Sequence, residues 1–301
     1  MLKKWEVIKI KTVRVGSRDS RLALAQTKIV IDEIKRYDPS IKIELITMKT
    51  KGDKILDKTL DKIGGKGLFL KELEEALIDK KVDITVHSYK DIPMEVNKDL
   101  PVVALSKRED ERDVLILPKG KKNSEKPLGT CSKRRSVQLK QLGFENIAPL
   151  RGNVITRLKK LDDGEYSSIV VAYAGLKRLG IEKRVSSYFP VNEIIPPAGQ
   201  GILAVQARKG EDTGYLKNFH NATSYVLSEA ERAFVTALDG GCSCPIAAHA
   251  YLENDVLVLN GLYVDEGKNV VLRGKRYGHS SQAVQIGIEL ANSLKKKGDA
   301  L

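Results

Sequence analysis

Short apolar runs alternate with amphipathic segments along the first two thirds of the chain. Near the start, Ser20 can cap a helix that continues to Tyr37, because apolar residues recur there at the spacing of one helix face. The elements expected in this part are strands over 12–16 and 41–50, a helix over 67–80 and a buried strand ending at Val86. Strands that alternate with helices predict a parallel sheet with right-handed crossovers.

The same alternation resumes after a charged passage, residues 106–112, which we interpret as a connection between domains. The elements expected here are strands over 114–117, 147–150 and 168–172 and helices over 132–142 and 153–161. A cluster of proline and glycine breaks the pattern at 196–201. The next apolar run, 202–207, is expected to be a strand that returns to the first sheet.

The last third of the chain has a different order of elements. A helix over 223–238 precedes three consecutive strands, and the elements that follow it are strands over 247–252, 256–264 and 270–277 and a helix over 281–296. Consecutive strands predict an antiparallel sheet in a small α+β domain. Because 301 residues exceed the size at which one core stops growing, several domains are expected. We predict domain 1 from residues 1–107 with 201–219, domain 2 from 108–200 and domain 3 from 220–301.

The formal net charge is +13, which is compatible with a nucleic acid, an anionic surface or acidic small molecules as partner. Many lysines lie in expected tails and linkers, where they would only solvate the surface. No nucleic-acid-binding motif is present, and the basic residues are not interleaved with aromatic residues, which make up 5% of the chain. We therefore expect no nucleic-acid partner.

Three cysteines, at 131, 242 and 244, form no C-x-x-C pair, which argues against a disulfide framework and a structural zinc site. A reducing cytosol suits this cysteine usage. The first residues are charged rather than apolar, and no stretch approaches the length that spans a membrane. We expect a cytoplasmic protein with neither a metal site nor a membrane partner.

Asp91 follows the buried strand at the edge where an α/β sheet binds ligands. It is the residue on which we expect the chemistry to depend, because the comparable turns carry mostly arginines. A single carboxylate among many guanidinium groups indicates an anionic substrate with one reacting cationic centre. The alternative is a surface ion pair between Asp91 and Lys90 at a turn fixed by Pro93.

Six arginines lie close to glycine or serine at the expected ends of elements, and we place most of them at strand-to-helix turns. They are Arg18, Arg134, Arg135, Arg151, Arg157 and Arg178, of which Arg157 projects from within a helix. Guanidinium groups bind carboxylates with two parallel hydrogen bonds, so together these side chains suit a ligand with several acid groups. Each arginine taken singly is better explained by a surface ion pair, and it is their recurrence at corresponding turns of two domains that favours a binding role.

Three further features carry candidate chemistry. The Gly64–Gly67 segment lacks the spacing of a phosphate-binding loop, and we interpret it as a lid bearing Lys66 or as a plain flexible loop. His87 is expected to be a packed histidine at a strand end, and Ser88 has no evident triad partner. The glycine-flanked Cys242 and Cys244 are candidates for a nucleophile or a covalent anchor, with two inert cysteines in a turn as the alternative.

Taken together, these segments resemble the porphobilinogen deaminases, also called hydroxymethylbilane synthases, from about Val13 to the end of the chain. The matching strings, in order, are V-x-V-G-S-R-D-S-R-L-A-L-A-Q, K-G-D-K-I-L-D, G-G-K-G-L-F, V-H-S-Y-K-D-I-P, R-E-D-E-R-D, G-T-C-S-K-R-R, L-R-G-N-V-x-T-R-L, A-G-L-K-R-L-G, P-x-G-Q-G and G-G-C. The chain departs from the common family pattern after Cys242, where Ser243 and Cys244 replace the usual Gln or His and Val.

The resemblance implies two α/β domains, similar to type-II periplasmic binding proteins, around a cleft, and a small C-terminal α+β domain. It implies a monomeric transferase that joins four porphobilinogen molecules into hydroxymethylbilane on a covalent dipyrromethane cofactor. Carried onto this chain, Asp91 is the catalytic residue and Cys242 anchors the cofactor by a thioether. The cofactor- and substrate-binding residues are then Arg18, Ser20, Lys66, Ser88, Lys90, Thr130, Ser132, Arg134, Arg135, Arg151, Gly152, Asn153, Arg157, Arg178 and Gln200.

Two α/β domains around a cleft suit anion capture as well as catalysis. A non-catalytic anion-binding protein or ligand sensor is therefore the alternative to an enzyme. Asp91 and Cys242 discriminate between them, because binding alone requires neither.

Overall fold

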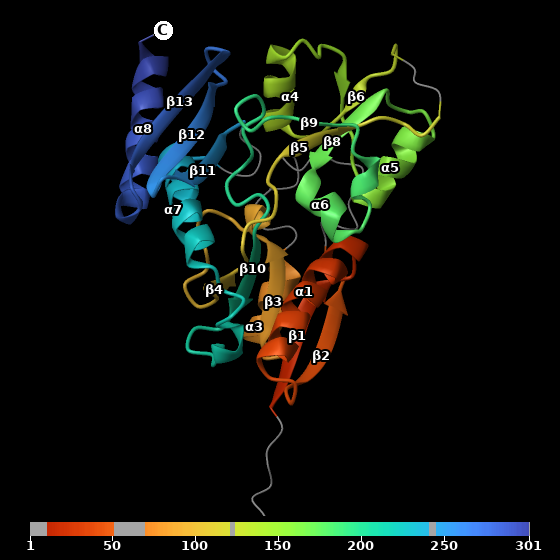
Figure 1. The fold of residues 1–301 in the computed structure, drawn as a ribbon, viewed down its shortest axis with the longest axis vertical. Coiled ribbons are helices and arrows are strands. Elements are labelled where there is room, and N and C mark those ends of the chain that lie inside the picture. Colours follow the sequence, from red (N-terminus) through yellow and green to blue (C-terminus); the bar gives the residue numbers. More distant parts are fainter. Residues whose placement is uncertain (1–10, 51–69, 121–123, 241–244, 301) are drawn as a thin grey trace, which may run out of the picture.

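A computed structural model of the chain describes residues 11–50, 70–120, 124–240 and 245–300. Lys66, Cys242 and Cys244 lie outside the described residues. Within these ranges the chain forms two five-stranded sheets and one three-stranded sheet. Figure 1 shows the first sheet at one end of the molecule and the other two side by side at the opposite end. No helix in the described part of the chain combines the length and apolarity needed to cross a bilayer.

The first sheet has the strand order β2-β1-β3-β10-β4. Its elements are β1 (Thr12–Arg18), α1 (Arg21–Tyr37), β2 (Lys42–Met48), α3 (Lys71–Ile78), β3 (Ile84–Ser88), β4 (Val102–Leu105) and β10 (Leu203–Ala207). Strand β10 returns to this sheet as predicted, but it runs antiparallel to both β3 and β4. The prediction of a purely parallel sheet is therefore wrong. The chain leaves at the carboxyl end of β4 and re-enters at that same end, so the returning strand must point the opposite way.

The second sheet has the order β7-β6-β8-β5-β9 and is also mixed. Its elements are β5 (Asp113–Ile116), β6 (Leu128–Gly129), α4 (Lys133–Gln141), β7 (Ile147–Ala148), α5 (Val154–Asp162), β8 (Ser168–Ala172), α6 (Tyr173–Arg178) and β9 (Ser187–Tyr188). Strand β6 is parallel to β7 and β8, whereas β5 is antiparallel to β8 and β9. The pattern did not predict β4, β6, α6 or β9, which are too short to show a period.

The third sheet, β11-β12-β13, is antiparallel throughout, as predicted. Its elements are α7 (Ala222–Ala237), β11 (Ala247–Glu253), β12 (Val256–Asp265), β13 (Val270–His279) and α8 (Ala283–Asp299). Helices α7 and α8 pack against each other and share a core with the sheet that includes Phe234 and Leu290. A Cβ on Gly287 would lie 2.4 Å from the carbonyl oxygen of Ala230, so the close approach of α8 to α7 requires glycine there.

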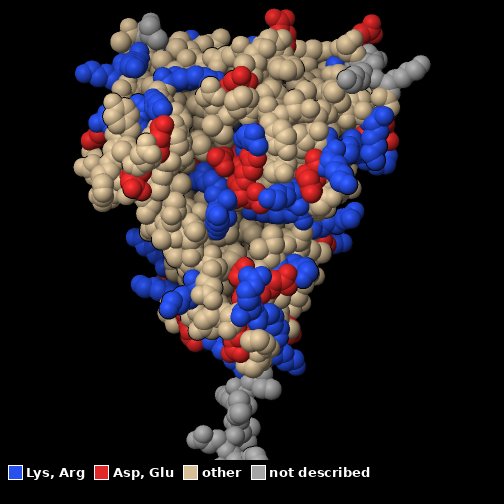
Figure 2. All heavy atoms as spheres, viewed as in Figure 1, with Lys and Arg blue, Asp and Glu red and all other residues tan. Residues whose placement is uncertain are grey.

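Each of the three units has its own buried core. The predicted fold class, two α/β units and a small α+β unit, is confirmed. The limits of the three domains stay a prediction. On the face drawn in Figure 2, Lys and Arg side chains are interspersed with Asp and Glu.

Candidate active site

Asp91 lies in a single 3-10 turn, Tyr89–Asp91, directly after β3. The strand is buried over its first four residues, and both Tyr89 and Ile92 are buried as well. Asp91 itself is exposed. Because Pro93 has no N–H, the turn cannot continue as a helix. The apolar residues on either side therefore hold the backbone in the core while the carboxylate faces outward at the carboxyl end of β3.

Arg18 and Ser20 lie at the carboxyl end of the neighbouring strand β1. Arg18 is the last residue of β1, and the Ser20 side chain caps α1 by accepting a hydrogen bond from the Ala23 N–H at 3.3 Å. Ser88, at the end of β3, accepts a 2.8 Å hydrogen bond from the amide of Gln26 on α1. The carboxyl ends of β1 and β3 thus place three of the predicted site residues at one edge of the first sheet.

His87 is a packed histidine, as predicted, with a side chain that is 5% exposed and 2.8 Å from the Thr85 hydroxyl. Burial, together with the charge of Arg18, lowers the pKa of His87 to about 3. The folded state therefore keeps His87 neutral at pH values where the unfolded chain binds a proton. The resulting loss of stability begins as pH falls through the ordinary histidine pKa and is complete below about pH 3.

We expect His87→Gln, which is neutral at every pH, to unfold with a flatter acid dependence than the wild-type chain. Between pH 6.5 and 4 the wild-type free energy of unfolding should fall by about 3 kcal/mol more than that of the variant. Urea unfolding at several pH values measures this difference. Parallel curves for the two proteins would show that His87 is not neutral in the folded state.

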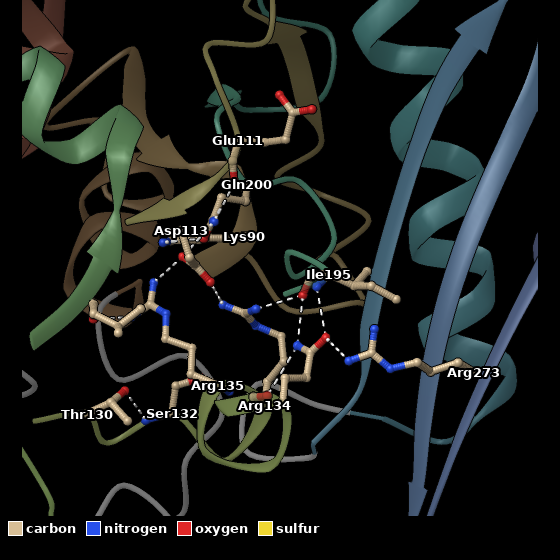
Figure 3. Close-up of polar contacts among 12 residues, drawn as sticks. Lys90, Glu111, Asp113, Thr130, Ser132, Arg134, Arg135, Ile195, Gln200 and Arg273 are labelled. Atoms are coloured by element: carbon tan, nitrogen blue, oxygen red, sulfur yellow. Dashed lines mark hydrogen bonds and ion pairs between the residues drawn. The ribbon is translucent and has the colours of Figure 1, made fainter. Parts of the chain in front are cut away.

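Arg134 and Arg135 lie in the first turn of α4, where both side chains are buried. They meet the fully buried carboxylate of Asp113 from either side, Arg134 at 2.6 Å and Arg135 at 2.7 Å (Figure 3). Arg134 also donates to the Ile195 carbonyl and Arg135 to the Val170 carbonyl. Burial raises the pKa of Asp113, but the two guanidinium groups outweigh it and hold the pKa well below its usual range.

Gln200 connects this cluster to Lys90. Its amide nitrogen donates to Asp113 at 3.1 Å and to the Glu111 carbonyl at 2.7 Å, while its amide oxygen accepts from Lys90 at 3.1 Å (Figure 3). Gly199 has a φ of +74°, and a Cβ there would lie 3.2 Å from the Lys90 backbone nitrogen. Burial lowers the pKa of Lys90 to about 8, although the Asp91 charge raises it. The loop over 196–201 therefore packs directly on the turn that carries Asp91.

A second group of site residues lies at the start of α5. Asn153 caps the helix through the Thr156 N–H at 3.0 Å, and Arg157 donates to the Gly152 carbonyl at 2.8 Å. Gly152 has a φ of +107°, which favours glycine. Burial lowers the pKa of Arg157 to about 10; the charges of Arg135 and Arg151 lower it further, and that of Asp91 raises it. The structure therefore brings Lys90, Asp91, Arg135, Arg151 and Arg157 together.

Thr130 and Ser132 lie at the N-terminal end of α4. The Thr130 hydroxyl accepts from the Ser132 N–H at 3.2 Å, and Ser132 caps the helix through the Arg135 N–H (Figure 3). Arg178 is placed differently from the prediction, at the last residue of α6 rather than at a strand-to-helix turn. It reaches the 196–201 loop by donating to the Gly201 carbonyl, and burial lowers its pKa to about 10.

Two family models match the chain. One described as "Porphobilinogen deaminase, dipyromethane cofactor binding domain" matches residues 13–215, and one described as "Porphobilinogen deaminase, C-terminal domain" matches 225–296. The porphobilinogen deaminase of Acetivibrio thermocellus is 55% identical over 292 residues, which cover 96% of this chain and 99% of that protein. That of Ruminiclostridium cellulolyticum is 56% identical over 289 residues, 95% of this chain and 98% of the relative. The chain belongs to the porphobilinogen deaminase family.

Solved structures also resemble the chain, at lower identity. The BenM effector binding domain with its effector benzoate has a TM-score of 0.41 and 16% identity, covering 69% of this chain and 88% of that domain. CbnR, a LysR family transcriptional regulator, has a TM-score of 0.43 and 13% identity, covering 69% of this chain and 67% of that one.

The described cations fit a dipyrromethane, the cofactor of the porphobilinogen deaminase family. Its two pyrroles carry acetate and propionate arms, so the group brings four negative charges. Arg135 retains a buried Nε atom without a hydrogen-bond partner. Burial also lowers the pKa of Lys90 and Arg157, a cost that bound carboxylates would offset. Within the described ranges no three His, Cys, Asp or Glu side chains are grouped as a metal site requires.

The sequence reasoning missed several residues that organise this site. They are Asp113, Gln138, Glu111, His249, Glu231 and Arg232, all of which contact site loops or the α4 arginines. Asp113 falls in the R-E-D-E-R-D string, whose charges we took for a linker. The other signal was Glu231-Arg232, two charges that lie between Ala230 and the apolar run Ala233–Val235 of α7.

Proposed function

We propose that this chain condenses four porphobilinogen molecules head to tail, releasing ammonia at each step, to give the linear tetrapyrrole hydroxymethylbilane. The observation that carries the proposal is a cluster of half-buried and buried cations near one exposed carboxylate, in a chain that both family models match. The enzyme is a transferase. Release of ammonia separates this function from binding alone.

The arginines and Lys90 bind the acid arms of the substrate and of the growing chain. Each added pyrrole contributes one acetate and one propionate, so several fixed guanidinium groups are needed as the product lengthens. Arg18 is the last residue of β1, Arg151 lies in the loop before α5 and Arg157 lies in α5, where the charges of Arg135 and Arg151 act on it. Arg134 contributes by fixing Asp113, since its donors reach Asp113 and the Ile195 carbonyl.

Asp91 stabilises the cation that forms when substrate loses its amine. The carbon–nitrogen bond breaks with both electrons leaving on nitrogen, and the pyrrole nitrogen shares the resulting positive charge. An ionised carboxylate beside the pyrrole N–H lowers the energy of that state more than the energy of the substrate before the bond breaks, when the pyrrole ring carries no charge.

The dipyrromethane supplies, when bound, the nucleophilic pyrrole carbon on which the first condensation takes place. We propose Cys242 as its thioether anchor, on the resemblance of the G-G-C string, although this segment lies outside the described residues. Helix α7 ends at Ala237, five residues before Cys242. We further propose, on the family resemblance, that the enzyme acts as a cytoplasmic monomer without nucleic-acid or membrane partners; on the face drawn in Figure 2, acidic residues are interspersed with the basic ones.

Intact-protein mass spectrometry tests the cofactor and its anchor. We expect the purified protein to carry a mass excess that matches two condensed pyrrole units. The excess should be absent from Cys242→Ser and present in Cys244→Ser, because only one thiol forms the thioether. An adduct lost in the Cys244 variant and kept in the Cys242 variant would reassign the anchor, and the absence of any adduct from active protein would refute the covalent cofactor.

A further inference from the structure

Arg232, on α7, holds the segment that follows Asp91. Its guanidinium donates to the carbonyl oxygens of three consecutive residues, Ile92 at 3.2 Å, Pro93, and Met94 at 3.0 Å. The same guanidinium lies over the ring of Tyr89, 4.8 Å from its centroid. The Arg232 side chain is 8% exposed, so these contacts are made out of reach of most solvent.

The contacts enclose the catalytic turn from both sides. Tyr89 precedes Asp91 by two residues and Ile92 follows it directly, so one guanidinium contacts a side chain before the carboxylate and the backbone after it. Met94 also packs against the hydrophobic core that α7 shares with α8. The turn is therefore held by the third unit as well as by its own strand, β3.

The neighbouring residue on α7 fixes the opposite loop of the site. Glu231, which is fully buried, accepts a 2.8 Å hydrogen bond from the Gly199 N–H and another from the Ala250 N–H. Gly199 packs on Tyr89 and on the Lys90 backbone, and Gln200 holds the Lys90 side chain. Consecutive residues of α7 thus hold two segments of the site. Arg232 holds residues 92–94, which follow Asp91, and Glu231 holds the 196–201 loop, which contacts Lys90.

We propose that Arg232 is a positioning residue for the known family reaction: from α7 it sets the place of the Asp91 carboxylate. The inference rests on the proposed role of Asp91. An arginine is required because its planar guanidinium has five N–H donors, so it can bond to three carbonyl oxygens in different directions while its face lies over an aromatic ring. A lysine keeps the charge but offers one compact ammonium, which cannot reach the three carbonyls together.

The test compares Arg232→Lys with the wild-type enzyme in steady-state assays of porphobilinogen consumption. We expect kcat to fall at least about tenfold, because small displacements of a reacting group are costly. KM should change less than about threefold, because most substrate carboxylates are bound by arginines of other elements. Cofactor content, read from the intact mass, should stay the same.

Leu290→Ala is the matched control. Leu290 lies in the same α7–α8 core and packs against Gly261 of β12 and Gly274 of β13, so its truncation loosens the third unit while the hydrogen bonds from Arg232 to residues 92–94 are kept. We expect it to lower Tm at least as far as Arg232→Lys does, with kcat within about twofold of wild type. A kcat for Arg232→Lys within twofold of wild type would overturn the proposal, as would an equal loss of kcat in Leu290→Ala.

Failure of a variant to fold and absence of turnover in the wild-type protein are also informative. If Arg232→Lys does not fold, Arg232→Gln, whose amide keeps two donors, takes its place with the same expected division between kcat and KM. Failure of both variants to fold would overturn the proposal, since Arg232 would then be required for the fold itself. A wild-type protein without turnover would refute the proposed function instead, so the two failures are distinguishable.

Discussion

Asp91→Ala is expected to lower the rate of porphobilinogen consumption at least about a thousandfold while the fold and the covalent cofactor are retained. The exposed carboxylate contributes little to packing, so its removal should leave Tm nearly unchanged. What is lost is the exposed negative charge beside Lys90 and Arg157, where a positive charge must develop on substrate. The size-matched Asp91→Asn should show the same loss, because it keeps the shape and removes the charge.

Asp212→Asn is the control for this prediction. Asp212 is exposed and pairs with Lys11 at the amino-terminal end of β1, opposite the edge that carries the site. The rate of porphobilinogen consumption by Asp212→Asn should equal that of the wild-type enzyme. Turnover retained in Asp91→Ala would refute the assigned role, whereas an equal loss in Asp212→Asn would point to a general effect of net charge.

Asp113→Asn is expected to have the largest effect on stability, lowering the free energy of unfolding by about 3–5 kcal/mol at neutral pH. The substitution leaves two buried guanidinium groups without their shared counter-charge and close to each other. Because folding holds the pKa of Asp113 below its unfolded value, the stabilisation is present above the unfolded pKa and is lost as pH falls through the folded one. Denaturant unfolding at pH 7 measures the difference. Arg135 would also lose its orientation, so less of the purified variant should carry the cofactor mass.

The matched control is Asp162→Asn, which breaks the pair between Asp162 and Arg184 near the surface of the same unit. Both side chains are part exposed, 27% and 18%, so solvent screens the pair and we expect a loss of less than about 1 kcal/mol. Similar losses in the two variants would show that burial does not set the importance of Asp113.

Hydrophobic periodicity predicted the long elements of this fold, and α1, α7 and β8 lie within a residue or two of their expected limits. It did not predict β6 or β9, which have two residues each, and it did not show that β10 runs antiparallel to its neighbours. Strand direction depends on where the chain re-enters a sheet. That information lies in the path between sheets and not in the strand's own residues.

The positions of candidate site residues were predictable where residue type and place in an element coincide, as for Asp91 after β3 and Arg18 at the end of β1. They were not predictable where a function depends on a partner distant in sequence. Asp113 meets Arg134 across 21 residues, and Arg232 reaches Pro93 across 139. In the sequence, a buried charged residue inside a helix or at the start of a strand cannot be told from an ordinary surface residue until its partner is known.

Ammonia release from porphobilinogen tests the central claim most directly, because an anion-binding protein or sensor would hold the substrate intact. Purified wild-type protein is mixed with porphobilinogen, and ammonia and remaining substrate are measured over time beside Asp91→Ala. The account predicts one ammonia for each porphobilinogen consumed by the wild type, and almost none with the variant. Saturable binding without ammonia from wild-type protein that carries its cofactor would contradict it.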